Sequence, residues 1–229
     1  MAATSLIEIC DLSKSYKEGD KRRYVFDNLN LTIAGGEFVA LLGSSGAGKS
    51  TLLNLISGID LPDCGRIRIG DSIITALSET ERTLFRRKHI GFVFQFFNLI
   101  TTLTVAENLL LPLELNSNKN LATHRQALDL LTRVGLANRQ QSFPENLSGG
   151  EQQRLAVVRA LAHRPRLVLA DEPTGNLDVA TGLRVLDLLL DLCRQNAATV
   201  VMVTHNEAIA ARTDRVLRLE NGRIEEISQ

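Results

Sequence analysis

A glycine-rich stretch between an apolar run and a helix-like segment constrains this chain more than any other feature. The apolar run Phe38 to Leu42 precedes it, and the helix-like segment Leu52 to Ser57 follows it. This order is typical of a loop that wraps a polyphosphate with backbone N–H groups at the positive end of the next helix. The stretch consists of Gly43, Ser44, Ser45, Gly46, Ala47, Gly48, Lys49, Ser50 and Thr51. It predicts a site for a nucleoside triphosphate.

Three side chains of this loop have distinct predicted roles. Lys49 would bridge the β- and γ-phosphates, Ser50 would supply a hydroxyl ligand to Mg²⁺, and Thr51 would reach the α-phosphate. Gly46 and Gly48 keep side chains away from the phosphates. Kinases, GTPases, motors and transporters share such a loop, so it predicts the ligand without choosing among these classes.

Composition places the chain among globular proteins and excludes some partners. Its 229 residues, 44% hydrophobic and 23% charged, suffice for one large domain or two small units. A formal net charge of zero lacks the broad basic field on which non-specific nucleic-acid binding relies, so we expect no DNA or RNA partner. No apolar run approaches the ~18 residues of a membrane-spanning helix, so another chain would have to cross any membrane that the protein serves.

The cysteines Cys10, Cys64 and Cys193 are odd in number and far apart. They lack the spacing of a zinc site or of a disulfide framework. We expect packing thiols in a reducing cytoplasm.

Strands dominate the predicted structure on both sides of the glycine-rich loop and its helix. Ser78 and Glu81 have capping-box spacing and predict a further helix that ends near Lys88. Tyr16 precedes a charged segment, Lys17 to Arg23, that we expect to form a loop. Two roles are open for the Tyr16 ring, stacking on a purine or packing at a strand end. The predicted strands are Leu6 to Leu12, Tyr24 to Ile33, Arg66 to Ile69 and Ile90 to Phe94.

Helical signals follow Gln95, which stands at the end of an apolar strand, where ligand contacts are common in parallel α/β sheets. Thr104 caps a predicted helix that Pro112 stops, and Gly135 stops a second predicted helix, Thr123 to Val134. These helices form an insertion within the α/β core. The apolar residues at its start belong either to the core or to an exposed patch that binds a partner. They are Phe96, Phe97 and Leu99.

A second candidate element for phosphate binding begins at Ser148. Ser148 and Glu151 have capping-box spacing for a helix that we expect to run to His163. A plain capped helix explains this pair but not Gly149 and Gly150, which leave the helix start bare and able to bind phosphate.

Two further apolar strands end in groups suited to phosphate chemistry. Leu167 to Ala170 leads directly to Asp171 and Glu172. Beside the glycine-rich loop, Asp171 would hold Mg²⁺ through water and Glu172 would polarise the attacking water. The run Thr199 to Val203 delivers His205 beyond its end, where a histidine can contact a γ-phosphate and sense hydrolysis.

Taken in this order, the motifs resemble the ATPase subunits of ATP-binding cassette transporters over essentially the whole chain. The resemblance implies an α/β fold: a phosphate-loop NTPase core with a mainly parallel sheet, an N-terminal antiparallel β subdomain and an inserted α-helical subdomain. Within a single domain over 1–229, the core and β subdomain would take residues 1–94 and 164–229. The glutamine loop, the helical subdomain and the signature helix would take residues 95–163.

The resemblance also implies roles for single residues. The catalytic set would be Glu172 as the base, His205 as the switch histidine and Gln95 in the glutamine loop. The Mg²⁺ contacts would come from Ser50, Gln95 and Asp171. ATP would be bound by the adenine-stacking aromatic Tyr16, the phosphate loop Gly43 to Thr51, the signature residues Ser148, Gly149 and Gly150, and Asp178 in the loop after the base.

The same resemblance implies a homodimer that sandwiches two ATP molecules, each between the phosphate loop of one subunit and Ser148 to Gly150 of the other. Gly91 to Gln95 and Asp171 to Asp178 look most like the branch that serves lipoprotein release, macrolide efflux and division-associated complexes. That branch implies a separate integral-membrane permease with an extracytoplasmic domain. It also implies a peripheral position at the cytoplasmic face of the inner membrane, held through the permease.

Three functions compete at this point. The first is a transport ATPase that powers a separate permease, and the second is a cassette ATPase that transmits a signal or remodels a cell-envelope complex. The third, a chromosome-maintenance or ribosome-associated ATPase, is the weakest, because Phe96 to Asn146 is a short helical insert without long heptad arms and the net charge is zero. The first two share the ATPase and differ in the partner.

Overall fold

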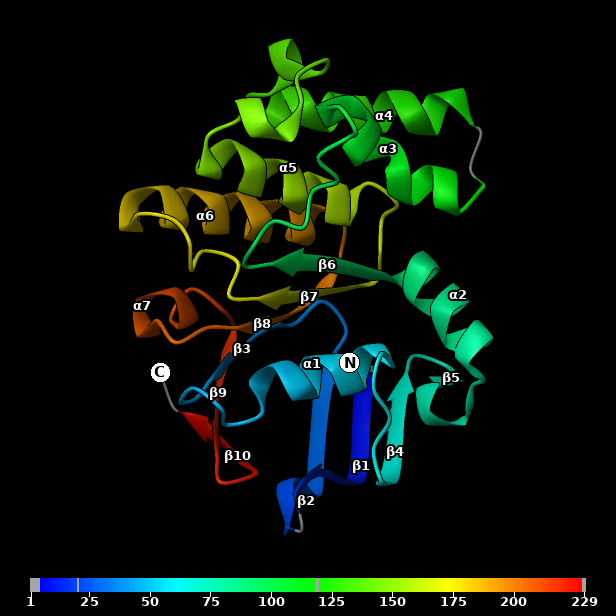
Figure 1. The fold of residues 1–229 in the computed structure, drawn as a ribbon, viewed down its shortest axis with the longest axis vertical. Helices are drawn as coiled ribbons and strands as arrows, with labels where there is room; N and C mark the ends of the chain where they lie inside the picture. The colour runs from blue at the N-terminus through cyan, green and yellow to red at the C-terminus, as the bar shows by residue number, and fades with distance from the viewer. Residues whose placement is uncertain (1–4, 20, 118–119, 228–229) are drawn as a thin grey trace. The chain divides into compact units, whose positions relative to one another are not determined.

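The computed structural model describes residues 5–19, 21–117 and 120–227. The chain forms two compact units (Figure 1). Unit 1 consists of Met1–Arg86 and Thr199–Gln229, and unit 2 consists of Arg87–Ala198. Within the described residues, no helix combines the length and the apolar character that a membrane crossing requires.

Unit 1 contains an antiparallel sheet with the strand order β2-β1-β4-β5. Its strands are β1 (Ser5–Glu18), β2 (Lys21–Ala34), β4 (Cys64–Ile69) and β5 (Ser72–Ile73). β1 and β2 form one long hairpin in which Tyr16 pairs with Arg23. The prediction of a loop from Lys17 to Arg23 is wrong, because Gly19, at a φ of 61°, allows a tight turn and backbone pairing extends both strands.

A second set of strands in unit 1 positions the glycine-rich loop. β3 (Phe38–Leu42) lies between β8 (Thr199–Val203) and β9 (Arg215–Glu220) and is parallel to both. β10 (Arg223–Ile227) pairs with β9 in an antiparallel hairpin. Every residue of β3 and β8 is buried, which is typical of parallel strands covered on both faces.

The helices of unit 1 start at the signals that the sequence contains. α1 (Lys49–Ser57) begins directly after the glycine-rich loop and ends at Gly58, whose φ of 68° is in the left-handed region. After a 3₁₀ turn at Ile74–Ala76, α2 (Glu79–His89) begins from the predicted capping box, in which the Ser78 amide and hydroxyl both donate to Glu81. α7 (Glu207–Ala210) follows β8.

Unit 2 pairs two parallel strands, β6 (Ile90–Phe94) and β7 (Leu167–Asp171). Its described helices are α3 (Val105–Leu115), α4 (Leu121–Arg133), α5 (Gly149–Leu161) and α6 (Val179–Gln195), with 3₁₀ turns at Ala137–Arg139 and Pro144–Asn146. α5 packs against β6, α3, α4 and α6 and is therefore the central helix of the unit (Figure 1). The buried run Leu155, Ala156, Val157 and Val158 supplies this packing.

Pro112 does not stop α3, and the predicted end of that helix is wrong. α3 continues to Leu115 although proline removes one N–H donor from the helix. Two features favour the continuation: Leu113 is buried, and the Asn116 side-chain amide satisfies the Pro112 carbonyl in the last turn at 2.8 Å. Tertiary packing and a side-chain bond thus override the local rule.

Two other helix boundaries in unit 2 shift slightly from their predicted positions. α4 begins at Leu121 rather than Thr123, because the Asn120 side chain caps it by accepting the Ala122 amide at 2.9 Å. Gly135, at a φ of 73°, lies just beyond the end of α4, as predicted. α5 ends at Leu161 rather than at the predicted His163, because the chain turns there towards β7.

The predicted fold class is confirmed by these elements. The chain is α/β, with an antiparallel β region, mainly parallel strands around the glycine-rich loop and an insertion of helices between β6 and β7.

The cysteines differ in exposure. Cys193 in α6 is buried, and burial raises the pKa of its thiol to about 12, so the prediction of a packing thiol is confirmed there. Cys10 is half-buried. Cys64 is exposed, so the prediction is wrong for it, because the first residues of β4 lie at an exposed end of the strand.

Candidate functional site

The glycine-rich loop joins the buried end of β3 to the first turn of α1. Gly46 and Gly48 have φ angles of 77° and 103°, which residues with side chains rarely adopt. A Cβ on Gly48 would lie 2.5 Å from Cγ1 of Val25, and one on Gly43 would lie 2.6 Å from the Leu219 carbonyl oxygen. Close packing against β2 and β9 therefore requires glycine at two positions of the loop.

Lys49 is the first residue of α1 and is only 8% exposed. Its ammonium donates to the carbonyl oxygens of Gly43 at 2.7 Å and Ser44 at 2.9 Å, at the other end of the loop. The first turn of α1 contains no acidic residue and donates no hydrogen bond to a capping side chain. The lysine and the helix start together form a positive site suited to phosphate groups.

Unit 1 brings His205 to the same sheet edge as this loop. β3 and β8 run side by side, and the Thr204 amide donates to the Leu41 carbonyl at 3.2 Å. The two strands therefore end together, with Gly43 after one and the exposed His205 after the other. This edge is where parallel α/β sheets commonly bind ligands.

Unit 2 has a corresponding edge at the ends of β6 and β7. Phe94 pairs with Asp171, so Gln95 and Glu172 are the next residues of the two strands. Asn176 joins them: its amide donates to the Gln95 carbonyl at 2.8 Å, and Gln95 Nε2 lies 3.5 Å from Asn176 Oδ1. The structure thus brings three of the predicted site residues, Gln95, Asp171 and Glu172, together within this unit.

The backbone at Glu172 is left-handed, with a φ of 45°, which is uncommon for a residue with a side chain. The Gly175 amide donates to the Glu172 carbonyl at 3.0 Å and closes a turn. A Cβ on Gly175 would lie 3.0 Å from Gln95 Nε2 and 3.2 Å from Glu172 Oε2, so both side chains converge on this glycine. Farther along, Asp178 caps α6 by accepting the Thr181 amide at 3.0 Å, and hydrogen bonding to Thr181 lowers the pKa of Asp178.

Ser148 is the N-cap of α5, with a complete capping box. The Ser148 amide and hydroxyl each donate to Glu151 Oε2 at 2.8 Å, and the bond from the amide is the main cause of a lowered pKa of Glu151. A Cβ on Gly150 would lie 2.8 Å from Cγ2 of Thr181, so packing against α6 favours glycine there. A Cβ on Gly149 would make only ordinary contacts at 3.7 Å. Packing therefore does not explain why residue 149 is glycine.

Gln153, which the sequence analysis did not select, connects α5 to both strand ends of unit 2. Its side chain is fully buried, and Nε2 donates to the carbonyls of Pro173 at 2.5 Å and Phe94 at 3.4 Å. Pro173 directly follows Glu172, and Phe94 directly precedes Gln95. The helix that begins at Ser148 is thus tied to the backbone beside both residues.

Arg159, also not selected from the sequence, holds the glutamine loop, residues 95–100. Phe97 and Asn98 have left-handed backbones, with φ angles of 59° and 49°. The Arg159 guanidinium donates to their carbonyls at 2.9 and 2.6 Å. The buried Asn108 of α3 accepts the Ile100 amide at 2.8 Å and donates to the Ile100 carbonyl at 2.9 Å. Side chains of two helices therefore hold this loop in place.

Two residues of the β1–β2 hairpin lie close to the phosphate-loop helix in unit 1. Tyr16 is 40% exposed, so it is not a core residue, and its hydroxyl donates to Asp60 at 2.7 Å. Arg23, which the sequence analysis did not select, donates to the Gly46 carbonyl at 2.9 Å. Its place in a basic run, after Lys21 and Arg22, is the sequence signal that indicates a contact with an anionic ligand.

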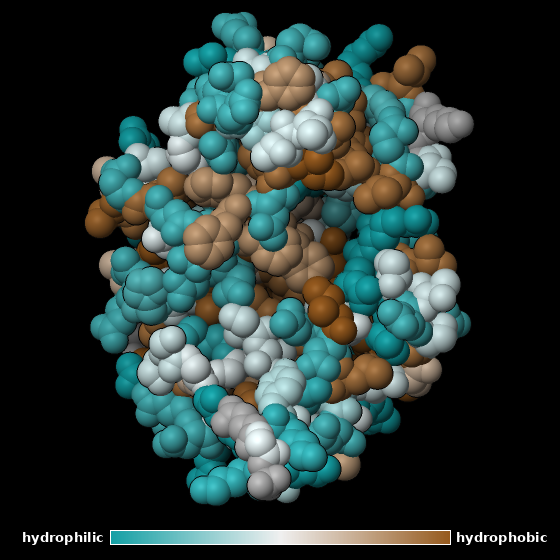
Figure 2. All heavy atoms as spheres, viewed as in Figure 1, coloured by the Kyte–Doolittle hydropathy of each residue, from teal (hydrophilic) through white to brown (hydrophobic). Residues whose placement is uncertain are grey.

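The apolar residues after Gln95 are divided between surface and interior. Phe96 is 72% exposed, so the interpretation as core is wrong for it, because it lies in the turn beyond the buried part of β6. Phe97 and Leu99 are half-buried. Figure 2 shows further apolar side chains exposed among hydrophilic ones. Exposure alone therefore does not define a partner site.

The residues selected for Mg²⁺ offer suitable donors. Ser50 has a hydroxyl, Gln95 an amide carbonyl and Asp171 a carboxylate, and Mg²⁺ prefers such oxygen ligands. Mg²⁺ at nucleotide sites usually takes only one or two protein ligands and completes its shell with phosphate and water. In the part of the chain that the structure describes, no group of three or more His, Cys, Asp or Glu residues could hold a metal.

Comparisons with known proteins agree on one family. The model of the ABC transporter family matches residues 26–175. An uncharacterized ABC transporter ATP-binding protein of Mycobacterium tuberculosis, Rv0986, is 55% identical over 96% of this chain and 88% of its own. The lipoprotein-releasing system ATP-binding protein LolD of Xanthomonas oryzae pv. oryzae is 47% identical over 99% of this chain and 93% of its own.

A solved structure is also similar over nearly the whole chain. It is the dimeric post-hydrolysis state of the ATP-binding cassette MJ0796 bound to ADP and Pi. The TM-score is 0.86, with 38% sequence identity, and the match covers 97% of this chain and 99% of that one.

Proposed function

The chain belongs to the ABC transporter family and is an ATP-binding, ATP-hydrolysing subunit, and we propose that two copies close around two ATP molecules to drive a separate membrane permease. The main support for an ATP site shared between two subunits is the start of α5. Its serine and glutamate serve as a cap, but Gly149 has no packing reason to be glycine. A helix start kept bare in this way favours a phosphate ligand. The similar cassette MJ0796 is dimeric with ADP and Pi bound, which supports a nucleotide-bound dimer.

In this proposal ATP binding belongs to the phosphate loop, Gly43 to Thr51. Lys49 would move its ammonium from the loop carbonyls to the β- and γ-phosphates. Backbone N–H groups of the loop and of the first turn of α1 would bind the remaining phosphate oxygens. Tyr16 would stack on adenine through the exposed part of its ring.

For hydrolysis, Glu172 would take a proton from the attacking water while the water oxygen bonds to the γ-phosphorus and the bond to ADP breaks. Gln95 would help to hold this water, and His205 would donate to the γ-phosphate. Ser50, Asp171 and Gln95 are the residues that would hold Mg²⁺. When bound, Mg²⁺ neutralises charge on the β- and γ-phosphates.

The shared site can be tested in a Glu172→Gln background, in which ATP should bind but turn over slowly. Mg²⁺ and ATP should then produce a stable dimer. Ser148→Arg should prevent the dimer, because a bulky cation at the start of α5 obstructs closure, while the monomer still binds ATP at its own phosphate loop. Light scattering reports mass, and a fluorescent ATP analogue reports binding on the same sample.

Ser78→Arg is the matched control for this experiment. Ser78 caps α2 through Glu81, with its amide and hydroxyl donating at 2.8 and 2.7 Å, but no glycine pair follows it. The control should lose the same kind of cap and still dimerise. Normal dimerisation of Ser148→Arg would contradict the shared site, and loss of monomer binding would assign Ser148 to the pocket of its own subunit.

We further propose that the exposed Phe96 and its neighbour Leu99 receive a short apolar segment of the permease. The chain would thereby be held at the cytoplasmic face of the membrane. The similarity to LolD supports a lipoprotein-release or export type of complex, with a permease that carries an extracytoplasmic domain. A cassette ATPase that transmits a signal or remodels an envelope complex is the alternative.

Replacing one exposed side chain tests this docking. Phe96→Asp should abolish stimulation of ATP hydrolysis by the permease, identified by purifying the complex from membranes, and should leave ATP binding by the isolated subunit unchanged. Leu121→Asp is the control, since Leu121 is 79% exposed in the same unit but distant in sequence from the glutamine loop. Unchanged association and stimulation of Phe96→Asp would rule out this docking position.

A further inference from the structure

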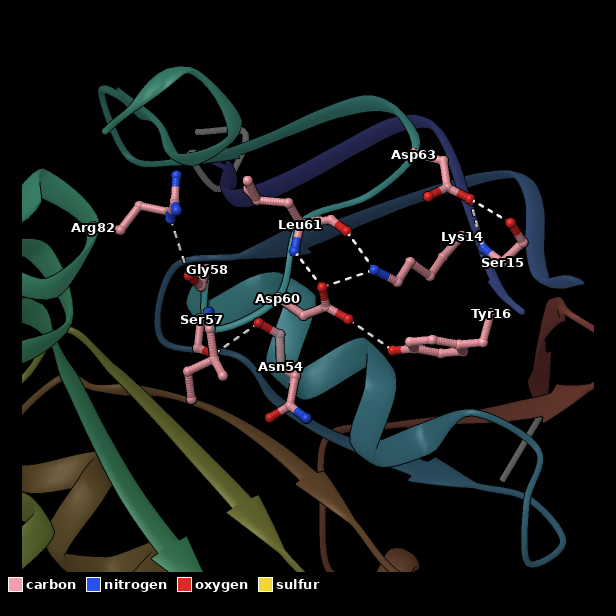
Figure 3. Close-up of polar contacts among 11 residues, drawn as sticks. Lys14, Ser15, Tyr16, Asn54, Ser57, Gly58, Asp60, Leu61, Asp63 and Arg82 are labelled. Carbon is pink, nitrogen blue, oxygen red and sulfur yellow. Dashed lines mark hydrogen bonds and ion pairs between the residues drawn. The ribbon is translucent and has the colours of Figure 1, made fainter. Parts of the chain in front are cut away.

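An ion pair behind Tyr16 holds its side chain in place (Figure 3). The Tyr16 hydroxyl donates to Asp60 Oδ2 at 2.7 Å, and Lys14 Nζ donates to Asp60 Oδ1, also at 2.7 Å. Lys14 is only 8% exposed and donates in addition to the Leu61 carbonyl at 2.7 Å. One carboxylate therefore binds the phenol with one oxygen and the ammonium with the other.

Lys14 also lies against the ring of Tyr16. Its Nζ is 4.9 Å from the ring centroid, so a cation covers one face of the ring. A base can then stack only on the other face. The attraction between this cation and the π electrons of the ring helps to fix the plane of the ring.

Asp60 is anchored to the helix that starts at the phosphate loop. The amides of Ile59 and Asp60 donate to the Asn54 carbonyl near the end of α1, at 3.0 and 3.2 Å. Figure 3 shows Asp60 just beyond this helix end, between Lys14 and Tyr16. The helix thus presents its first turn to the proposed phosphate site and carries at its other end the carboxylate that holds Tyr16.

The ionisation of these groups supports a fixed cluster. Burial alone would raise the pKa of Asp60, but hydrogen bonds from Lys14 and Tyr16 outweigh it and hold that pKa below its usual value. Burial, together with the hydrogen bond to Asp60, raises the pKa of Tyr16. At neutral pH, Asp60 is therefore an ionised acceptor and Tyr16 a neutral donor.

We infer that Lys14 and Asp60 are positioning residues for nucleotide recognition, which hold the Tyr16 ring in the orientation that stacks on adenine at a distance from the phosphate loop set by α1. The inference rests on the proposed base-stacking role of Tyr16. The pair contributes to the part of the ATP affinity that depends on the base and leaves the part that depends on the phosphates unchanged.

Binding of two ligands to the full chain separates these parts: ATP and inorganic tripolyphosphate, each with Mg²⁺, measured by calorimetry. Tyr16→Ala should lower ATP affinity about 5- to 150-fold, the range for one base stacked on an aromatic ring, and leave tripolyphosphate affinity unchanged. Lys14→Met and Asp60→Asn should each lower ATP affinity about 3- to 10-fold, because each removes a contact that orients the ring. Neither should affect tripolyphosphate, and neither should weaken ATP binding further in a Tyr16→Ala background.

Two more variants control for folding. Glu8→Gln breaks the ion pair between Glu8 and Arg68, which joins β1 to β4 in the same sheet. It should change stability without changing ATP affinity. Tyr16→Phe keeps the ring and removes the hydroxyl, with its bond to Asp60 and its contact with Thr51, so it should lower ATP affinity about 2- to 10-fold even if Lys14→Met does not fold.

The possible outcomes distinguish this inference from the proposal on which it rests. Equal losses of ATP and tripolyphosphate affinity, or losses that add to that of Tyr16→Ala, would overturn the positioning role and leave Tyr16 as a base-binding ring. Parental ATP affinity of Tyr16→Ala would show that the proposed stacking role itself is wrong, and the inference would fail with it.

Discussion

The phosphate loop of unit 1 and the glutamine loop of unit 2 both use left-handed backbone, but they reach it with different residues. In the phosphate loop, Gly46 and Gly48 adopt φ angles of 77° and 103°. In the glutamine loop, Phe97 and Asn98 adopt 59° and 49° with their side chains present. Such angles are easy for glycine and strained for most other residues.

What keeps each loop in place differs as well. The phosphate loop is packed closely, since a Cβ on Gly48 would collide with Val25, and it is also held by hydrogen bonds from Lys49 and Arg23 to its own carbonyls. The glutamine loop is fixed by hydrogen bonds from Arg159, Asn108 and Asn176, which come from elsewhere in unit 2. A strained backbone persists only while its surroundings hold it. We therefore expect the first loop to keep its shape and the second to respond to a docked partner.

The largest expected effects distinguish ATP binding by Lys49 in unit 1 from ATP hydrolysis by Glu172 in unit 2. Glu172→Gln should keep ATP binding and lower turnover about 10²- to 10⁴-fold, the usual contribution of a general base. Lys49→Ala should lose binding as well, because it removes a cation that binds phosphates directly. Hydrolysis at saturating ATP, measured beside equilibrium binding, checks both. A Glu172→Gln variant that hydrolysed ATP at the parental rate would show that another group is the base.

Gly48→Ala tests whether packing fixes the phosphate loop. Left-handed strain and the contact with Val25 should weaken ATP binding about 10- to 100-fold, which corresponds to a strain of about 1–3 kcal/mol. Gly135→Ala is the control, because it has a φ of 73° but its Cβ would meet nothing within 4 Å. It should leave ATP affinity unchanged. Normal ATP binding by Gly48→Ala would show that the phosphate loop does not depend on close packing at this glycine.

Arg159→Met tests whether side chains hold the glutamine loop. The carbonyls of Phe97 and Asn98 would lose a charged donor, so the free energy of unfolding should fall by about 2 kcal/mol. Amide exchange in residues 95–100 should become faster while ATP affinity stays at the parental value. Arg133→Met, at an exposed arginine bonded to Gln195, should change stability by no more than about 0.5 kcal/mol. Equal effects of the two variants would contradict the special role of Arg159.

The smallest expected effect is a difference between the two units in how their stability changes as the pH falls. Burial lowers the pKa of His163 below 6.5, so the unfolded chain takes up the proton first and unit 2 loses stability as the pH falls below 6.5. Burial also lowers the pKa of His89. Asp60 in unit 1 has a pKa lowered from 3.8, so its contribution is present above 3.8 and is lost only below that value.

Protection from amide exchange, corrected for intrinsic rates, should therefore weaken in unit 2 before unit 1 as the pH falls from about 7 to about 5. His163→Gln should reduce this difference, because a glutamine amide can keep the contact with the Ile90 carbonyl, 3.2 Å from His163 Nε2, without taking up a proton. An unchanged difference would show that His163 is not responsible.

Local patterns predicted the strands and the motifs. β3, β7 and β8 are buried almost throughout and appear in the sequence as continuous apolar runs. The capping boxes at Ser78, Thr104 and Ser148 depend on residues three positions apart, so spacing alone identified them. The local stop signal at Pro112 failed, because α3 continues past it and buries Leu113.

The supports of the candidate site could not be predicted in the same way. Lys14 and Asp60 are 46 positions apart, and Arg159 and Asn98 are 61 positions apart. A single charged residue on a strand or helix carries no local pattern that reveals such a partner. The residues proposed to contact ATP were therefore accessible from the sequence, whereas those that hold them became visible only from the packing of each unit.

The unequal exposure of the cysteines makes the native chain suitable for selective chemical labelling. The Cys193 thiol is buried and, with a pKa of about 12, stays protonated and unreactive near neutral pH. Cys10 is half-buried, whereas Cys64 is exposed and therefore the most accessible of the three. Cys64 follows Asp63, which accepts hydrogen bonds from the amide and hydroxyl of Ser15, the residue before Tyr16. A fluorophore on Cys64 would lie near the proposed base site and report nucleotide binding without an engineered attachment point.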